Sequence, residues 1–334
     1  MKFKKIKKIV SLLLVILMLL LTGCAKQRVS EEDSLRVVGT VGEFEVSYGE
    51  FRFVLLSYMN ILTEAYGEDI FDTPESANKY ADMIWEHINE SITVNYAVLT
   101  MCREVGIEMT DPALERYLNE KMEEHIKSFG GKGAYILSLN ENYMTDSFFR
   151  FNVLVDKMQN ELFYVYVDDL GIIERGESEE DVYKTINENF IRTQHVYISK
   201  TNGKSCDENQ ALIEEAHKRL QNGEDFISVV NDYGEDNEMK ELGIYITKGY
   251  MSHSYEDIAF ELTCGKYSDI VEDENGFYII KRLDLDTGYV MLNMNSLFEK
   301  YQKYTFLNMI NETQKTLKFT PNDYLKSLDI FEVK

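Results

Sequence analysis

The stretch that decides the fold runs from Thr193 to Leu285. It opens with Thr193-Gln194-His195-Val196-Tyr197-Ile198 and closes with Asn275-Gly276-Phe277-Tyr278-Ile279-Ile280-Lys281-Arg282. Both pieces have the alternation of a half-buried strand, and Asn275-Gly276 is typical of a turn. Because successive side chains of a strand point to opposite faces, we expect His195 and Val196 on opposite faces of one sheet.

Between these strands the pattern predicts helices over 207–222 and 226–232, a strand over 242–246 and a third helix. Asp207 and Gln210 have the spacing of a capping box, and Gly223 is a typical helix stop. Ser254 and Asp257 are expected to cap the third helix. This order of elements indicates a small α+β domain with helices packed on an antiparallel sheet.

These segments, in this order, resemble the parvulin family of peptidyl-prolyl cis-trans isomerases, in its secreted branch. His195 lies where the family has its opening histidine strand, and Leu242-Gly243 is similar to its Asp-Leu-Gly turn. Gly249-Tyr250-Met251 resembles its Gly-Gln-Met step. Tyr255 to Phe260 is similar to its Phe-Glu-x-Ala-x-Phe helix, and 275–280 to its closing Gly-x-His-Ile-Ile strand.

The resemblance implies a site for twisting a prolyl peptide bond, a reaction that needs no metal or cofactor. Its polar wall comprises three candidate catalytic residues, His195, Asp236 and Tyr278. Its apolar slot for the proline ring comprises four candidate substrate-binding residues, Leu242, Met251, Tyr255 and Phe260. Two other interpretations stay open: His195 as a structural hydrogen-bonding residue on a sheet face, and Met251 with Tyr255 as plain domain core.

Two residues depart from the family pattern. Tyr255 stands where the family usually has phenylalanine, and we expect its ring to keep the slot while its hydroxyl points to water. Tyr278 stands where the family usually has a second histidine, which removes a partner that would set the tautomer of His195. We therefore expect an altered hydrogen-bond network and weak isomerase activity.

Helical patterns flank this domain. Ser47 and Glu50 have capping-box spacing after a predicted strand at 37–42, and further helices are expected to start at Thr73, Thr110 and Thr145. The strand-turn-helix opening resembles the N-terminal domain of the SurA and PrsA extracytoplasmic chaperones. A mostly apolar stripe from Leu297 to Leu317 predicts a C-terminal helix, which in that family packs on the N-terminal helices.

The expected fold class is therefore α+β: a mostly helical, SurA-like domain, completed by the C-terminal helix, with a parvulin-like domain inserted in it. The predicted ranges are 24–36 for a tether, 37–189 for the helical domain, 190–286 for the parvulin-like domain and 287–334 for the C-terminal segment.

The first 23 residues read as an export signal, with lysines before the apolar run from Ile9 to Leu21. Leu21-Thr22-Gly23-Cys24 resembles the bacterial lipobox. That resemblance implies cleavage before Cys24, a diacylglyceryl group on its sulfur, and attachment to the outer face of the cytoplasmic membrane. Three cysteines remain, an odd number that argues against a disulfide scaffold, and no Cys/His spacing suggests a metal.

The net charge of −23 at pH 7 argues against a nucleic-acid partner. The expected partners are unfolded or partly folded secreted polypeptides with X-Pro segments, and the expected function is that of a membrane-anchored extracytoplasmic foldase. One alternative is a non-catalytic holding chaperone with a degenerate parvulin domain. A solute-binding lipoprotein is disfavoured, because the helical run from Ser47 to Leu162 lacks repeated strand-helix units. The oligomeric state is not predicted.

Overall fold

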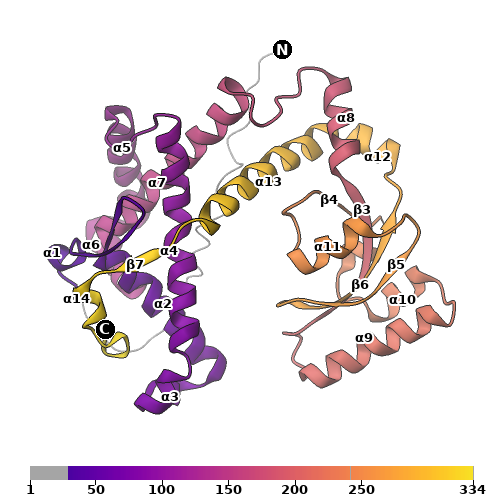
Figure 1. The fold of residues 1–334 in the computed structure, drawn as a ribbon, viewed down its shortest axis with the longest axis horizontal. Coiled ribbons are helices and arrows are strands. Elements are labelled where there is room, and N and C mark those ends of the chain that lie inside the picture. The colour runs from indigo at the N-terminus through magenta and orange to yellow at the C-terminus, as the bar shows by residue number, and fades with distance from the viewer. Residues whose placement is uncertain (1–28, 241, 334) are drawn as a thin grey trace. The chain divides into compact units, whose positions relative to one another are not determined.

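The computed structural model describes residues 29–240 and 242–333, so the predicted export signal and Cys24 lie outside the described residues. The chain divides into two compact units (Figure 1). Among the described residues, we call 29–171 with 309–333 the helical unit, and Ile172–Asn308 the sheet unit. The α+β fold class is confirmed. No helix within the described ranges is long and apolar enough to cross a membrane.

The helical unit is built from helices around a small sheet (Figure 1). Its elements are α1 (Glu31–Ser34), β1 (Val37–Val41), β2 (Phe44–Ser47), α2 (Tyr48–Tyr66), α3 (Pro74–Asn78), α4 (Ala81–Glu104), α5 (Pro112–Ser128), α6 (Lys132–Glu141), α7 (Asp146–Tyr164), β7 (Phe319–Pro321) and α14 (Asp323–Lys326). Thr145 caps α7 as predicted, since its hydroxyl accepts from Phe148 N. The helix predicted from Thr73 is two helices, α3 and α4, and α6 is an additional one.

The C-terminus completes this unit. Strand β7 pairs antiparallel with β1, with Thr320 opposite Thr40, in a sheet of order β2-β1-β7. Phe319 is 4% exposed and its backbone N–H donates to Asn89 Oδ1 at 2.9 Å. The expected packing of the C-terminal segment on the N-terminal helices is thus seen for residues 309–333.

Residues 287–308 instead belong to the sheet unit, in contrast to the predicted segment 287–334. Helix α12 (Thr287–Leu292) and the first part of α13 (Met294–Lys315) pack with α8 (Glu179–Asn189). The reason is a shared apolar cluster in which Ile186, Val290 and Leu297 are all buried. Helix α8, expected within the helical domain, lies in the sheet unit for the same reason.

The sheet unit carries a four-stranded antiparallel sheet of order β4-β3-β6-β5. Its remaining elements are β3 (Ile191–Ser199), α9 (Cys206–Gln221), α10 (Phe226–Tyr233), β4 (Ile244–Ile246), α11 (His253–Glu261), β5 (Tyr267–Glu272) and β6 (Gly276–Leu283). Helices α9 and α10 cover one sheet face and α11 the other (Figure 1). In the β3–β6 register Val196 faces Ile279 and Tyr197 faces Tyr278, so the predicted alternation is confirmed.

Two predicted caps in this unit were displaced by two residues. Helix α9 starts at Cys206, and its capping box joins Ser205 to Glu208, not Asp207 to Gln210. Helix α11 is capped by Ser252, whose hydroxyl accepts from Tyr255 N, not by Ser254. Each segment offers several short polar side chains in succession, and only the one whose oxygen reaches the N3 backbone N–H acts as the cap.

The predicted capping box of α2 is only half formed. Ser47 Oγ accepts from Glu50 N at 3.2 Å, but the Glu50 carboxyl group turns into the core, where the Tyr96 hydroxyl donates to it at 2.8 Å. Glu50 is 2% exposed, and this burial raises its pKa to about 8 despite the opposing effect of the Tyr96 hydrogen bond. At neutral pH the group is therefore held mainly in its neutral form.

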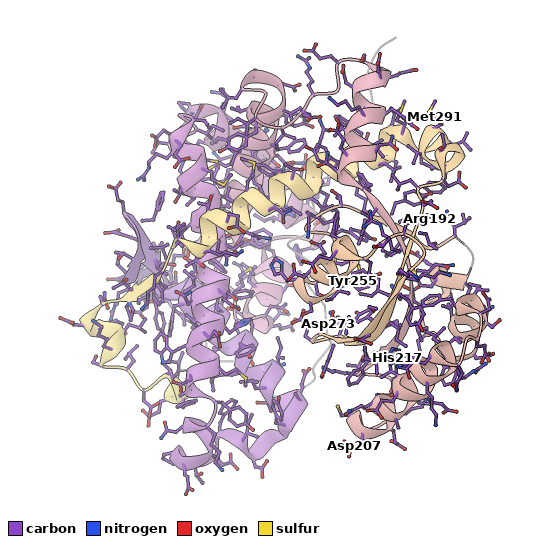
Figure 2. The ribbon with its side chains drawn as sticks, turned by 45° about the vertical axis from the view of Figure 1, so that its right-hand side comes forward. Arg192, Asp207, His217, Tyr255, Asp273 and Met291 are labelled. Atoms are coloured by element: carbon purple, nitrogen blue, oxygen red, sulfur yellow. The ribbon has the colours of Figure 1, made fainter. Side chains whose placement is uncertain are left out.

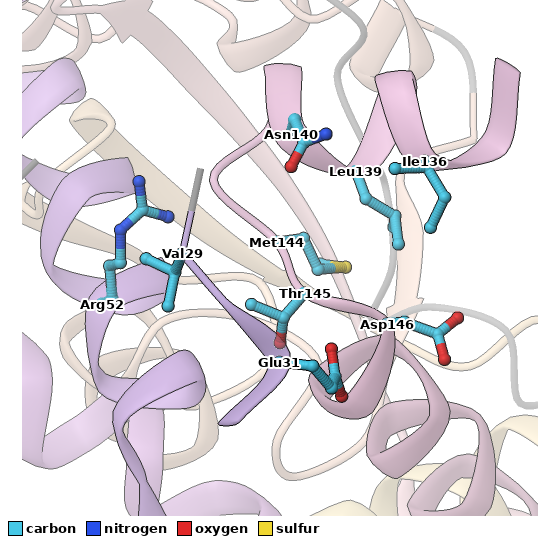
Figure 3. A pocket seen from close by; sticks show the side chains of 9 residues that line it. All are labelled: Val29, Glu31, Arg52, Ile136, Leu139, Asn140, Met144, Thr145 and Asp146. Atoms are coloured by element: carbon cyan, nitrogen blue, oxygen red, sulfur yellow. The ribbon is translucent and has the colours of Figure 1, made fainter. Parts of the chain in front are cut away.

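Arg52 supports the turn between α6 and α7. The residue is buried beside a cavity of about 200 Å³ that Val29, Asn140 and Met144 also line (Figure 3). Its guanidinium Nη1 donates to the backbone carbonyl of Tyr143 at 3.1 Å. Tyr143 has a φ of 58°, in the region that disfavours side chains with a Cβ, so this bond stabilises a strained turn.

Glu50 makes the stability of the helical unit depend on pH. Because its folded pKa lies above its unfolded value of about 4.5, its stabilising effect is complete below pH 4.5 and is lost as pH rises through about 8. Over that window the unfolding free energy should fall by up to about 1.4 kcal/mol per pH unit. Glu50→Gln should flatten the dependence, as measured by chemical denaturation from pH 5 to 8.5. The exposed Glu45→Gln is the control, and a slope unchanged by Glu50→Gln contradicts the assignment.

Phe319→Ala tests the closure of the helical unit by β7. Removing a buried phenylalanine ring costs about 3–5 kcal/mol, so the thermal transition of this unit should move down while that of the sheet unit stays. The exposed neighbour Lys318→Ala should change neither transition. If the helical unit of Phe319→Ala melts at the wild-type temperature, the strand does not close it.

Candidate functional site

The candidate site lies on the sheet face covered by α11. Thr193, His195 and Tyr197 alternate onto this face from β3, and Tyr278 joins them from β6, directly opposite Tyr197. Helix α11 adds Tyr255, whose position in the sheet unit is labelled in Figure 2. All of these side chains except Tyr197 are buried. Strand alternation is thus the local rule that collects them.

A chain of hydrogen bonds runs through the site. The Tyr255 hydroxyl lies 2.9 Å from Thr193 Oγ1 and 3.0 Å from His195 Nδ1. On the other side of the ring, His195 Nε2 lies 3.3 Å from Asp236 Oδ2. With neutral His195 the chain has one consistent direction: Thr193 donates to Tyr255, Tyr255 to Nδ1, and the Nε2 proton points to the carboxylate. Both ring nitrogens are therefore engaged.

The expectation that the Tyr255 hydroxyl faces water is wrong. Tyr255 is fully buried, and burial raises the pKa of its hydroxyl above the usual value. A hydroxyl placed away from water must find hydrogen-bond partners, and Thr193 and His195 are the ones within reach. Helix α11 thus supplies, through Tyr255, a hydrogen-bond partner for His195 in place of the family's second histidine.

Asp236 reaches the site from the segment between α10 and β4. Its Oδ1 accepts from Glu238 N at 2.9 Å, which orients the carboxylate, and its Oδ2 faces His195. The hydrogen bond from His195 lowers the pKa of Asp236, and partial burial opposes this effect. Asp236 is 33% exposed in its side chain whereas His195 is 3% exposed. The carboxylate is therefore the part of the chain that meets solvent.

Tyr278 contacts His195 through its ring. The two ring centroids are 5.5 Å apart at an interplanar angle of 90°, and Tyr278 also stacks on Tyr197 at 4.8 Å. Burial is the main cause that raises the pKa of Tyr278, and the neighbouring carboxylate of Asp273 adds to it. Tyr278 therefore places an edge-to-face aromatic contact against His195.

Three of the four predicted slot residues come together. Tyr255 is buried at the centre of an apolar cluster, and Met251 and Phe260 pack against it, half-buried. Leu242 is not part of this cluster: its side chain is 49% exposed and lines a separate pocket with Tyr250. Leu242 was assigned to the slot because Leu242-Gly243 is similar to the family's Asp-Leu-Gly turn. In the structure this turn directs the Leu242 side chain away from Tyr255.

Glu256 is a structural residue of the site that the sequence reasoning missed. It is 3% exposed, and its carboxylate oxygens accept from Gly249 N and Met251 N, both at 2.9 Å. These bonds tie the loop that carries Met251 to α11. The sequence did contain a sign of this role, because Glu256 matches the glutamate of the family's Phe-Glu-x-Ala-x-Phe pattern.

Gly243 and Thr193 were also missed. Gly243 has a φ of 71°, and a Cβ there would lie 2.3 Å from the Thr193 carbonyl oxygen, so the turn before β4 requires glycine. Thr193 was quoted only as the start of a strand. No group of three His, Cys, Asp or Glu suited to a metal occurs within 29–240 and 242–333. Cys206 and Cys264 are free thiols in the structure.

Comparisons with known proteins agree with this geometry. Residues 190–284 match the model of the rotamase family, described as a PPIC-type PPIase domain. Foldase protein PrsA from Caldanaerobacter subterraneus is 24% identical over 78% of this chain and 77% of its own length. Foldase protein PrsA from Clostridium tetani is 23% identical over 96% of this chain and 97% of its own length.

A solved structure of peptidylprolyl isomerase PrsA from Bacillus anthracis is 20% identical over 66% of this chain and 94% of that chain, with a TM-score of 0.36. The matches to the family model and to the two relatives support a parvulin-type foldase similar to PrsA, in which residues 190–284 form the peptidyl-prolyl cis-trans isomerase domain.

Proposed function

We propose that this foldase acts outside the cytoplasm, anchored to the membrane through Cys24, and isomerises X-Pro bonds of unfolded secreted polypeptides at the site of His195, Asp236 and Tyr278. The observation that carries the proposal is the hydrogen-bond chain through Tyr255 and Asp236, which engages both ring nitrogens of His195. The helical unit is proposed to hold the client chain. Relatives named foldase protein PrsA support the folding role.

The barrier that such a site must lower is that of twisting a peptide bond, about 18–20 kcal/mol in the free peptide. No nucleophile is required, because no covalent bond is made or broken. The site must favour the twisted amide over the planar ones, and fixed hydrogen-bonding groups in a partly dry setting do this. His195, held on both nitrogens and backed by Asp236, is such a fixed polar group.

Met251, Tyr255 and Phe260 are proposed as the apolar wall that receives the proline ring, and Leu242 as a flanking contact. Met251 and Phe260 are half-buried and so retain surface for a ligand, whereas Tyr255 supports them from below. The competing hypothesis is a non-catalytic holding chaperone. It is favoured by one observation, the full burial of Tyr255, which leaves its own ring no surface for proline.

Tyr255→Phe separates these hypotheses. The change restores the family's usual residue and keeps the ring, so proline-peptide binding should persist. It removes the donor to His195 Nδ1, and leaving a buried group unpaired costs about 1–3 kcal/mol, so turnover should fall by about tenfold. The measurement is the isomerisation rate of a proline peptide by exchange spectroscopy, with binding followed in parallel.

Tyr278→His in the Tyr255→Phe background should recover part of the rate, since it returns a hydrogen-bonding partner to the wall. Tyr197→Phe is the control, because the Tyr197 hydroxyl donates to Asn275 O at the exposed end of the strand. A wild-type protein that binds proline peptides without isomerising them, and stays inactive with Tyr278→His, would establish the holding chaperone.

Cys24→Ser tests the anchor. The lipobox resemblance requires the cysteine sulfur for lipid attachment, so the variant should remain uncleaved or be released from the membrane. The measurement is membrane fractionation with mass spectrometry of the N-terminus. Cys206→Ser, at an exposed thiol far along the chain, should leave processing intact. Normal processing and retention of Cys24→Ser would rule the anchor out.

A further inference from the structure

A pocket of about 450 Å³ opens beside the candidate site, within the sheet unit. Its wall is formed by residues of the segment after Asp236, of the turn before β4, and of α12 and α13. Leu242 and Tyr250 line it, so it adjoins the loop that carries Met251. The rest of its wall includes Tyr289 and Lys300, which have no role in the candidate site.

Lys300 is an incompletely neutralised cation in this wall. Its ammonium group donates to the backbone oxygen of Tyr245 at 2.6 Å and lies 3.2 Å from the centroid of the Tyr250 ring. Among the described residues no carboxylate forms an ion pair with it. An ammonium group has three donors, so a ligand in the pocket can still accept one.

Burial and the neighbouring charges determine the protonation state of Lys300. Burial is the main cause that lowers its pKa to about 8; the carboxylate of Glu238 opposes this effect, and Lys303 lowers the pKa further. Glu238 lines the same pocket without contacting the ammonium group. Taking a cation partly out of water without a counter-ion costs free energy, and a ligand carboxylate in direct contact recovers it.

We propose that this pocket is a second subsite for the client polypeptide, in which Lys300 binds the carboxylate of an acidic side chain close to the X-Pro bond. Tyr250 and Tyr289 supply flat apolar surface for the stem of that side chain, and Tyr250, which also packs against the apolar cluster with Met251 and Phe260, connects the subsite to the proline-binding wall. The proposal rests on the proposed isomerase function and adds a substrate preference to it.

The test compares proline peptides that carry one glutamate, placed in turn at each of three positions on either side of the proline, with the matched glutamine peptides. The protein is the chain without residues 1–23. At one or more positions the glutamate peptide should bind about tenfold more tightly, the effect of one charge-assisted hydrogen bond. Lys300→Met should abolish this difference and leave the glutamine peptides unaffected.

Two variants separate charge recognition from a structural role. Lys300→Arg keeps the cation and should keep the preference, and Lys303→Met, one turn away on α13, should keep it as well. Equal binding of glutamate and glutamine peptides at every position overturns the subsite. So does a Lys300→Met variant that weakens both peptides alike, which shows that the lysine only supports the backbone of β4.

The failure of the proposed function has a different signature. If no peptide is isomerised while glutamate peptides still bind preferentially through Lys300, the subsite stands and catalysis does not. If all peptides are isomerised at equal rates with equal affinity, catalysis stands and the subsite does not.

Discussion

The site depends on one buried hydroxyl group, that of Tyr255. A hydroxyl removed from water without partners costs about 1–3 kcal/mol, so the fold must bring hydrogen-bonding groups to it. Thr193 and His195 meet this need because they are two residues apart on β3 and therefore share a face. The position of α11 over the sheet and the orientation of the His195 ring are fixed by the same bonds.

The two faces of the four-stranded sheet have different roles. The face under α9 and α10 is closed with apolar side chains such as Val196 and Ile279, which stabilise the unit by burial alone. The face under α11 buries Thr193, His195 and Tyr278 among apolar neighbours. Polar groups are tolerated there only as members of a satisfied network, so the chemistry of the site and the stability of the unit are linked.

Segments without regular structure bring two further groups to the site, and carboxylates hold both in place. The Asp236 carboxylate is oriented by the hydrogen bond that it accepts from Glu238 N. The Glu256 carboxylate holds the loop of Met251 by accepting hydrogen bonds from two backbone N–H groups of that loop. Charge-assisted hydrogen bonds of this kind restrict a loop more strongly than apolar contacts, because they have a preferred direction. The polar wall and the apolar wall are therefore positioned by the same device.

The sequence by itself determined the α+β class, the strands β3 and β6, and the opposite faces of His195 and Val196, because strand alternation is a local property of the chain. Tertiary structure decided the partner of the Tyr255 hydroxyl, the outward direction of Leu242 and the inward turn of Glu50. It also divided the segment after residue 286 between the two units. These outcomes depend on which groups burial brings together across tens or hundreds of residues, and a side chain's type and sequence neighbours do not specify that.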